Sequence, residues 1–547
     1  MALLAIDIET YSDVDLTKSG VYAYCDSPQF EILLFAYAFD DEPTEIIDLA
    51  CGEQLPKRVL DALEDTAVIK TAFNAAFERT CISKHLGKKL SPASWQCTAV
   101  QSAMLALPLS LDGVGEVLDI QRKKLKEGAD LVRFFSMPCK ATKANGGRTR
   151  NLPSHEPEKW ERFKAYCIRD VDAEREIRHK LRNYPISESE MRLYQMDQEI
   201  NDRGILVDRE LVANAVLCDT EYKEAVTARA YELTGLDNPN SPAQIKGWLT
   251  DRGVEVDSLD KKAVKSMISD ADGEVLEVLQ LRLLMAKTSV KKYEAIERSV
   301  CSDGRCHGLL QFYGANRTGR WAGRLVQVQN LPQNHIVDLE LARNLVKNRQ
   351  FDLIDLLYDS TPGVLSELIR TAFVPRPGTR FIVADFAAIE ARVLAWFSGE
   401  QWRLTTFEEG GDIYCASASQ MFGVPVVKHG ENGHLRQKGK IAELALGYGG
   451  SVGALTSMGA LDMGMQEEEL QPLVNQWRAS NPHITKFWWD VDAAAVKAVK
   501  ERTSVTYKNL CFSYRSGILF VTLPSGRSLS YIKPRMTQNR FGRESLS

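Results

Sequence analysis

The chain has 547 residues and a mass of 61.3 kDa, and its 68 basic and 73 acidic residues give a formal net charge of −5. This length accommodates roughly three or four domains. The near-balanced charge neither indicates nor excludes nucleic acid as a partner, so local patches must carry any such binding. The 11 cysteines show no metal-ligand pairing, which indicates a reducing, cytoplasmic setting. No apolar run approaches the length of a membrane span, and an acid at Asp7 leaves no room for the apolar region of a signal peptide.

The first predicted element is an apolar strand that leads into two carboxylates. Residues 3–6 are Leu-Leu-Ala-Ile, and Asp7-Ile8-Glu9 follows directly. Because side chains alternate along a strand, Asp7 and Glu9 are expected on the same face. Two carboxylates at this spacing can share a metal ion.

Two later segments add acids to this region. An apolar strand predicted at 68–73 leads to Glu78, and a predicted helix carries Tyr166 and Asp170 one turn apart. Any one of these acids alone is typical of a solvated surface. In this order they resemble the three motifs of a DEDD-type 3′–5′ exonuclease in its tyrosine-containing version.

This resemblance implies a ribonuclease H-like fold and two metal ions, Mg²⁺ or alternatively Mn²⁺. Asp7, Glu9 and Asp170 would hold the ions, and Tyr166 would orient the attacking water. The middle motif normally ends in Asp, whereas this chain has Glu78. The added methylene moves the carboxylate by about a bond length, and the carboxylate can still reach a metal through a water.

Two basic segments follow, each with two interpretations. Residues 140–150 form a basic, glycine-containing loop that is either a solvated surface loop or a clamp on single-stranded DNA. Residues 281–293 carry Lys287 and Lys291 beside an apolar stripe, as either a solvated helix face or a contact with duplex phosphates. Around the second segment the pattern is helical, with a turn at 204–208 and a helix cap at 238–242.

The C-terminal half contains a second candidate site. An apolar run at 380–384 predicts a buried strand that leads into Asp385, which can be a metal ligand or simply a turn residue. Farther on, charged, apolar and aromatic residues recur every four positions and would form one stripe on a helix. Such a stripe can hold a triphosphate and pack a base, whereas a solvated basic helix end would not account for the aromatic ring. The stripe consists of Arg436, Lys440, Leu444 and Tyr448.

These two segments resemble the D-[YF]-S-x-I-E-x-R motif and the R-x3-K-x7-Y-G helix of family A DNA polymerases. The resemblance implies that Asp385 and the backbone carbonyl of Phe386 are metal ligands and that Glu390 blocks a ribose 2′-hydroxyl. The four residues of the stripe would bind the incoming nucleotide. Leu444 and Glu443 replace an aromatic residue and an asparagine that are usual in the family, which bears on stacking and sugar discrimination.

Other segments extend the resemblance. Residues 318–321 and 329–334 resemble the T-G-R and N-L-Q-N-I-P segments, which implies that Arg320, Arg324 and Asn330 contact primer–template DNA. Residues 411–414 resemble G-D-I-H, with Tyr414 in place of His. The resemblance also implies a second palm carboxylate in a His-Asp-Glu or similar motif, but no such tripeptide occurs between Tyr448 and Ser547. We therefore expect a palm that is truncated, split or interrupted and a chain that by itself polymerises weakly or not at all.

The expected fold is therefore α/β and multidomain, with a ribonuclease H-like exonuclease followed by a right-hand polymerase. The expected domains are the exonuclease at 1–185, a helical thumb at 186–310, the first part of the palm at 311–400, fingers at 401–505 and the return to the palm at 506–547. The resemblance implies a phage-type replicative polymerase in the host cytoplasm that acts on primer–template DNA and dNTPs, with a processivity factor that the sequence does not identify. The alternatives are a chain active only as an exonuclease and a non-catalytic DNA-binding fragment.

Overall fold

The computed structural model describes residues 2–121, 127–285, 290–358, 360–539 and 542–547. The chain divides into two compact units, Met1–Ala103 with Leu107–Phe381 and Met104–Ala106 with Ile382–Ser547. Each unit is described by itself. None of the helices in the described ranges is long and apolar enough to cross a membrane.

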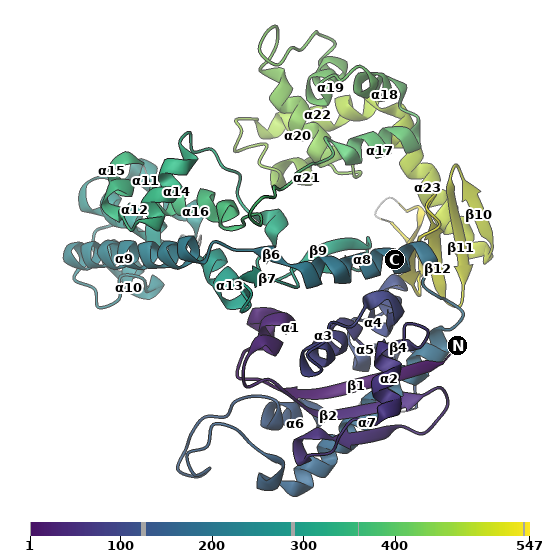
Figure 1. The fold of residues 1–547 in the computed structure, drawn as a ribbon. Coiled ribbons are helices and arrows are strands. Elements are labelled where there is room, and N and C mark those ends of the chain that lie inside the picture. The colour runs from purple at the N-terminus through teal and green to yellow at the C-terminus, as the bar shows by residue number, and fades with distance from the viewer. Residues whose placement is uncertain (1, 122–126, 286–289, 359, 540–541) are drawn as a thin grey trace. The chain divides into compact units, whose positions relative to one another are not determined.

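The N-terminal part of the first unit is built on a mixed five-stranded sheet with the order β3-β2-β1-β4-β5 (Figure 1). The central strand β1 runs antiparallel to β2 and parallel to β4, and the β1–β2 register shifts between Glu9 and Thr10. The expected strands at 3–6 and 68–73 are both present, as parts of β1 and β4. The strands are β1 (Leu3–Tyr11), β2 (Glu31–Phe39), β3 (Glu45–Asp48), β4 (Ile69–Ala72) and β5 (Trp95–Cys97).

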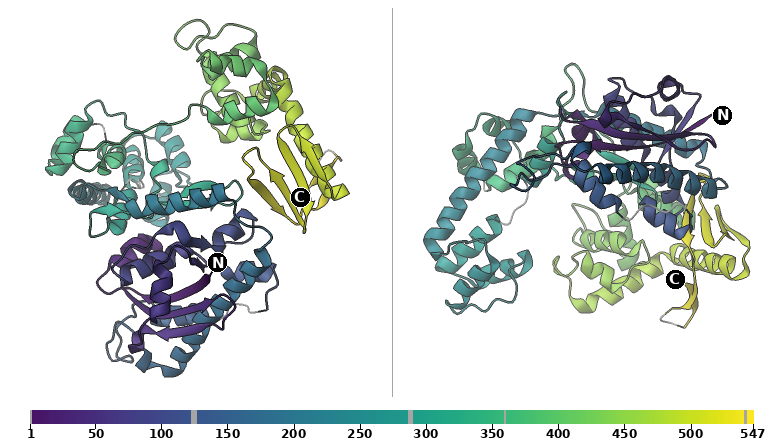
Figure 2. Two further views of the ribbon diagram at one scale, coloured as in Figure 1. Left: turned by 45° about the vertical axis from the view of Figure 1, so that its right-hand side comes forward. Right: turned by 90° about the horizontal axis from the view of Figure 1, so that it is seen from below.

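Helices pack on this sheet, and the long helix α7 lies against β1 and β2 (Figures 1 and 2). Its buried side chains Trp160, Phe163 and Val171 pack with Phe135 of α6 against apolar side chains of the sheet. Because the apolar face of α7 packs on the sheet, the orientation of the helix relative to β1 is fixed. The helices are α1 (Leu16–Asp26), α2 (Lys57–Glu64), α3 (Ala75–His85), α4 (Thr98–Met104), α5 (Leu111–Val117), α6 (Gly128–Phe135) and α7 (Pro157–Leu181).

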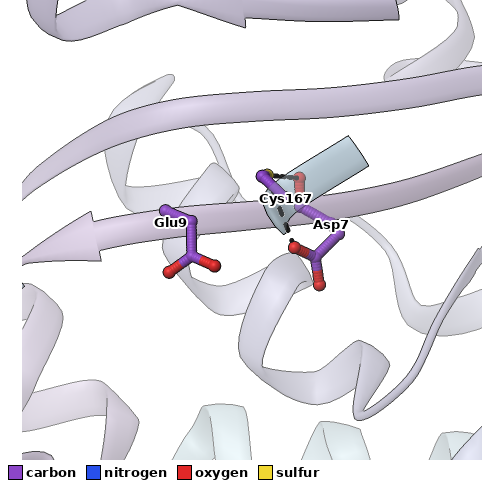
Figure 3. Close-up of side chains that lie close together, drawn as sticks. All are labelled: Asp7, Glu9 and Cys167. Carbon is purple, nitrogen blue, oxygen red and sulfur yellow. Dashed lines mark hydrogen bonds between the residues drawn. The ribbon is translucent and has the colours of Figure 1, made fainter. Parts of the chain in front are cut away.

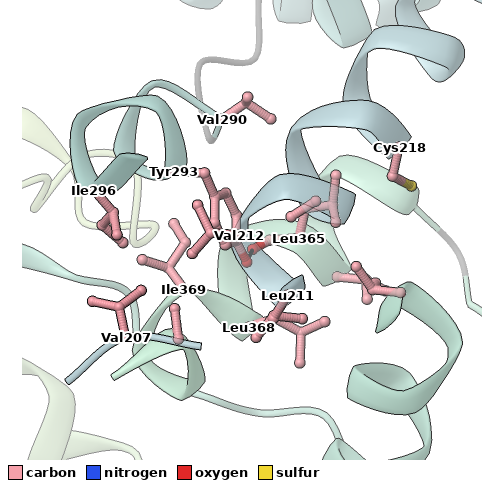
Figure 4. Close-up of a cluster of buried hydrophobic side chains, with 14 of the residues drawn as sticks. Val207, Leu211, Val212, Cys218, Val290, Tyr293, Ile296, Leu365, Leu368 and Ile369 are labelled. Carbon is pink, nitrogen blue, oxygen red and sulfur yellow. Dashed lines mark hydrogen bonds between the residues drawn. The ribbon is translucent and has the colours of Figure 1, made fainter. Parts of the chain in front are cut away.

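The rest of the first unit is mainly helical and has its own core (Figure 4). In that core the Tyr293 hydroxyl donates a 2.7 Å hydrogen bond to the carbonyl of Leu365, which satisfies the buried polar end of the ring. The elements are α8 (Glu188–Arg203), β6 (Ile205–Leu206), α9 (Arg209–Thr234), α10 (Pro242–Thr250), α11 (Lys261–Asp270), α12 (Gly273–Met285), α13 (Lys291–Ser299), β7 (Arg305–Cys306), β8 (Leu310–Ala315), β9 (Arg320–Gly323), α14 (Leu339–Lys347), α15 (Phe351–Leu357) and α16 (Thr361–Leu368).

Two expectations for this region have different outcomes. The helix cap expected at 238–242 is present, because the Ser241 side chain accepts a hydrogen bond from the backbone N–H of Gln244. The basic helix face expected along 281–293 stays a prediction, because residues 286–289, which lie between α12 and α13, are outside the described residues. Lys287 lies outside the described residues.

The second unit has a helical part and a sheet. Helices α19 and α20 pack closely at Gly439, where a Cβ atom would lie 2.3 Å from the carbonyl oxygen of Tyr414. Strands β10 to β13 form an antiparallel sheet in chain order. The elements are α17 (Ile389–Ser398), α18 (Gln401–Glu408), α19 (Ile413–Phe422), α20 (Leu435–Leu446), α21 (Val452–Ser457), α22 (Glu467–Ser480), α23 (Pro482–Glu501), β10 (Ser504–Tyr507), β11 (Leu510–Arg515), β12 (Ile518–Thr522), β13 (Ser528–Ile532), β14 (Met536–Gln538) and β15 (Glu544–Leu546).

The buried strand expected at 380–384 is not formed. Residues 379–386 adopt neither helix nor strand, and Ile382 and Val383 are 88% and 90% exposed. An apolar run becomes a strand only where a neighbouring strand satisfies its backbone groups. No strand within the described ranges pairs with these residues.

Candidate active sites

The first candidate site lies where β1, α3 and α7 meet. Asp7 and Glu9 are on β1, Glu78 is in the first turn of α3, and Tyr166 and Asp170 are one turn apart on α7. One ligand atom from each of Asp7, Glu9 and Cys167 lies within 4.8 Å of the others (Figure 3). This is the only such group of three or more His, Cys, Asp or Glu residues in the described part of the chain. It does not include Asp170, which the sequence placed among the ligands.

The acids of this site are buried close to one another. Glu78 is 4% exposed, and its Oε2 atom has no hydrogen-bond partner among the described residues. Burial raises the pKa of the Glu78 carboxyl well above its usual value, and the charge of Asp7 raises it further. Asp170 and Glu9 are also buried. Oxygen donors held in this way suit a hard divalent cation such as Mg²⁺ or Mn²⁺.

The tyrosine of the site is held by its neighbours. Tyr166 stacks on Phe163 with ring centroids 6.2 Å apart and planes 12° from parallel. A Cβ atom on Gly128, the first residue of α6, would lie 2.0 Å from a Tyr166 ring carbon, so only glycine leaves space for the ring. Burial raises the pKa of Tyr166, and the charges of Asp170 and Glu9 raise it further. The ring therefore presents a neutral hydroxyl beside the carboxylates.

The sequence interpretation missed one functional group of this site, the thiol of Cys167. The thiol is fully buried and lies 3.4 Å from Asp7 Oδ2 and 3.6 Å from the carbonyl oxygen of Asp7. The available signal was its position on the motif helix, next to Tyr166 and three residues before Asp170. On a helix, that spacing places residues 167 and 170 on one face.

The basic loop 140–150 is compact and exposed. The Asn145 side-chain amide donates hydrogen bonds to the carbonyls of Lys140 at 2.9 Å and Arg148 at 3.2 Å. The Arg150 guanidinium lies over the Tyr11 ring, 3.8 Å from its centroid. Lys140 and Lys143 are exposed. The loop thus exposes Lys140 and Lys143, and hydrogen bonds from the Asn145 side chain hold its backbone.

The second candidate site lies in the second unit, around α20. Arg436, Lys440 and Leu444 are on this helix, but α20 ends at Leu446, so Tyr448 is in the turn that follows. The four-residue stripe is therefore helical only over its first three members. The Leu444 and Tyr448 side chains are exposed.

The Arg436 side chain has a local partner. Its Nε donates a 2.8 Å hydrogen bond to Asp412 Oδ2, and the guanidinium lies 5.3 Å from the centroid of the Tyr414 ring. Burial alone would raise the pKa of Asp412, but the hydrogen bond and charge of Arg436 outweigh it and lower that pKa. The unusual Tyr414 thus lies beside the first cation of the stripe.

Glu443, which departs from the family pattern, has a structural role. Its carboxylate accepts a 2.7 Å hydrogen bond from Arg403 Nη1, and the two side chains are 5% and 0% exposed. Trp477 Nε1 and Ser417 Oγ donate to the same carboxylate at 2.9 and 2.7 Å. Glu443 therefore links α20 to α18, α19 and α22 through a buried ion pair.

The metal ligands expected in this unit lie in exposed positions. Asp385 and Phe386 are in the irregular segment before α17, and Glu390 is in the first turn of α17. Within the described residues, Asp385 belongs to no group of three potential ligands. The structure thus places Asp385 on the surface and not at the end of a buried strand.

The residues expected to contact DNA are exposed in the first unit. Arg320 is on β9, Arg324 follows that strand, and Lys291 is the first residue of α13. The Asn330 side-chain amide donates a 3.2 Å hydrogen bond to Gln327 Oε1. These residues therefore lie at the surface of the first unit.

Comparisons with known proteins bear on both sites. Residues 217–512 match the sequence model described as "DNA polymerase family A". The chain is 58% identical over 550 residues to the "DNA polymerase" of Bacillus phage SP02, an alignment that covers 100% of this chain and 85% of that protein. It is 25% identical over 312 residues to the "DNA polymerase I" of Pseudomonas aeruginosa, which covers 55% of this chain and 30% of that protein.

A solved structure agrees at the level of fold. The POL domain of Pol1 from M. smegmatis, in complex with DNA primer-template and dNTP, superposes with a TM-score of 0.58 at 17% identity. The superposition covers 96% of this chain and 77% of that one. Together, the family match over more than half of the chain and the phage relative at 58% identity show that this chain belongs to the family A DNA polymerases.

Proposed function

We propose that this DNA-directed DNA polymerase also carries a 3′–5′ proofreading exonuclease, within residues 1–185 of its first unit. The observation that carries the proposal is the concentration of buried acids where β1, α3 and α7 meet. Glu78, with an unpartnered oxygen and a raised pKa, is the strongest sign that a cation belongs there. A site that served only to stabilise the fold would not gather like charges away from water.

In the proposed exonuclease, the acidic residues would bind metal ions and the tyrosine would orient the attacking water. Asp7, Glu9 and Asp170 would hold divalent metal ions, with Glu78 reaching them directly or through a water. When bound, such ions activate a water and neutralise charge on the phosphoryl group. Tyr166 would orient the attacking water through its neutral hydroxyl, because the surrounding carboxylates disfavour its ionisation.

For nucleotide transfer we propose the second site. Enzymes of this family use divalent metals, generally Mg²⁺, and Asp385 with the carbonyl of Phe386 would be the ligands in this chain. Arg436, Lys440, Leu444 and Tyr448 would bind the incoming dNTP, with the cations on its phosphates. Glu390 would oppose a ribose 2′-hydroxyl.

Primer–template DNA would contact Arg320, Arg324, Lys291 and Asn330, whose exposure supports this role. Lys287 stays a sequence-based proposal. The thumb, palm and finger ranges proposed from sequence also stay predictions, and the helices from α8 to α13 fit a helical segment at 186–310. The phage relative supports a role in phage DNA replication within a host cell.

The test uses a 5′-labelled primer–template with Mg²⁺, with and without dNTPs, and three proteins: wild type, Asp7→Ala and Asp385→Ala. We expect primer shortening that is lost in Asp7→Ala, and any extension to be lost in Asp385→Ala. A chain active only as an exonuclease would show shortening without extension in all but Asp7→Ala. Shortening that persists at the wild-type rate in Asp7→Ala would overturn the exonuclease proposal.

A further inference from the structure

The buried thiol of Cys167 changes the chemistry of the N-terminal acidic site. Figure 3 shows the Asp7 and Glu9 carboxylates side by side on β1 and the Cys167 side chain of α7 directed at Asp7. Carboxylates are hard ligands that suit Mg²⁺ and Mn²⁺, whereas sulfur is a soft ligand that selects Zn²⁺ and similar cations. A site with both kinds of donor can therefore distinguish cations that an all-oxygen site treats alike.

We propose that Asp7, Glu9 and Cys167 together form a mixed oxygen–sulfur site for a thiophilic divalent cation such as Zn²⁺ or Cd²⁺. The inference rests on the proposed exonuclease site, because two of the three ligands are shared with it. It goes beyond that proposal in assigning a ligand and a class of cation that exonuclease chemistry does not require.

The geometry suits such a cation. In a tetrahedral zinc site with a Zn–S bond of about 2.3 Å and a Zn–O bond of about 2.1 Å, the sulfur and oxygen ligands lie about 3.6 Å apart. The Cys167 sulfur is 3.4 Å from Asp7 Oδ2, and all three donor atoms lie within 4.8 Å of one another. The sulfur and the Asp7 oxygen are therefore already at the spacing of two ligands of one cation, and a Glu9 oxygen lies within 4.8 Å of both.

A second, independent observation points to a cation at this place. Glu78, from a different element, is buried beside Asp7 with one oxygen that no described residue satisfies. That carboxylate can accept a hydrogen bond from a metal-bound water, as the outer ligands of metal sites do. The acids and the thiol thus come from three elements and face one place.

The thiol plays different parts with the two classes of cation. As an S–H donor to the Asp7 carboxylate, Cys167 would position that ligand for a hard cation such as Mg²⁺. With Zn²⁺ or Cd²⁺, the S–H bond breaks, the proton leaves to solvent and the sulfur lone pair binds the cation. The oxidation states of sulfur and metal do not change.

The test is a Cd²⁺ titration of the full chain, followed by the ultraviolet charge-transfer absorption of sulfur–cadmium bonds. The variants are Cys167→Ser, which keeps a hydroxyl donor but loses the soft ligand, and Asp7→Asn, which loses an oxygen ligand. Cys139→Ser is the control for loss of a different thiol, because Cys139 is half-buried and lies directly before the basic loop.

We expect a saturable band in wild type and Cys139→Ser that is lost in Cys167→Ser and weakened in Asp7→Asn. The Cd²⁺ affinity should fall at least about tenfold in Cys167→Ser, the lower end of the cost of losing a partner in a metal shell. The Mn²⁺ affinity, which rests on oxygens, should change much less.

Two results would overturn the inference. The first is a band and a Cd²⁺ affinity in Cys167→Ser that equal those of wild type. The second is a band that disappears in Cys167→Ser but is untouched in Asp7→Asn, which would mean that a thiol alone binds the cation. Because the band is read without any nuclease assay, it separates this inference from the proposed exonuclease, whose own failure would be absence of Mg²⁺-dependent primer shortening.

Discussion

The replacement of Gly128 by alanine is expected to disable the proposed exonuclease without touching any of its acids. The new Cβ atom would lie 2.0 Å from Tyr166 Cε2 and 2.6 Å from two further ring atoms. Ordinary carbon–carbon contacts are about 3.5 Å or longer, so the ring must move by about 1.5 Å. Phe163 stacks on the same ring, which restricts where the ring can go.

A misplacement of about 1 Å in a reacting group can cost about 100-fold in rate. We therefore expect the Gly128→Ala protein to remove nucleotides from a 5′-labelled single strand about 100-fold more slowly than the wild-type protein does. Overpacking should also cost about 1–3 kcal/mol of unfolding free energy, measured by denaturant titration.

The matched control is Gly247→Ala, also a glycine within a helix, where nothing lies within 4 Å of the new Cβ atom. This control should keep the wild-type hydrolysis rate and stability, or gain up to about 1 kcal/mol from helix propensity. A double-mutant cycle then isolates the clash, because Gly128→Ala should cost little in a Tyr166→Ala background. A folded Gly128→Ala protein that hydrolyses DNA as fast as the control would refute this reasoning.

Three further predictions concern the basic loop and two buried ion pairs. Lys143→Glu should weaken binding to single-stranded DNA and reduce the slope of log affinity against log salt by about 0.7 per lost phosphate contact, whereas the same change at an exposed lysine of α2 should not. Glu443→Gln should destabilise the second unit by about 3–5 kcal/mol, because it leaves its arginine partner buried without a counter-charge, and thermal unfolding will measure this. Burial alone would raise the pKa of Asp202, but the hydrogen bond and charge of Arg79 bring it below its usual 3.8. The pair therefore stabilises the fold above about pH 4 and ceases to do so as pH falls through the lowered pKa, so the melting-temperature difference between wild type and Asp202→Asn should shrink in acid.

Local sequence patterns predicted the N-terminal region well. The apolar run at 3–6 predicts a strand, on which alternation places the two following acids on one face, and the structure has β1 with Asp7 and Glu9 in one cluster. The four-residue spacing of Tyr166 and Asp170 predicts one helix turn, and both lie on α7. These signals depend on neighbours in the chain, so single-sequence reasoning can read them.

Features that depend on distant packing were not predictable in this way. The contact of Cys167 with Asp7 exists because α7 packs on β1, which brings together residues 160 positions apart. The space that Gly128 leaves for Tyr166 likewise depends on how α6 packs against α7. The helical stripe failed at Tyr448 because α20 ends two residues earlier, at Leu446 before Gly447.

The difference between the two candidate sites follows from the same physical principle. The strand at 3–9 is largely buried because neighbouring strands on both sides of β1 satisfy its backbone groups, and its carboxylates are held on that strand, Glu9 buried and Asp7 half-buried. The run at 380–384 is equally apolar, but no strand pairs with it in the described ranges, so its side chains and Asp385 remain exposed. An apolar composition allows a segment to be buried as a strand, but the segment is buried only where a neighbouring strand pairs with its backbone groups. An acid expected at the end of a strand is therefore only as well positioned as the pairing of that strand, which makes the acids of the proposed exonuclease the better preorganised set among the described residues.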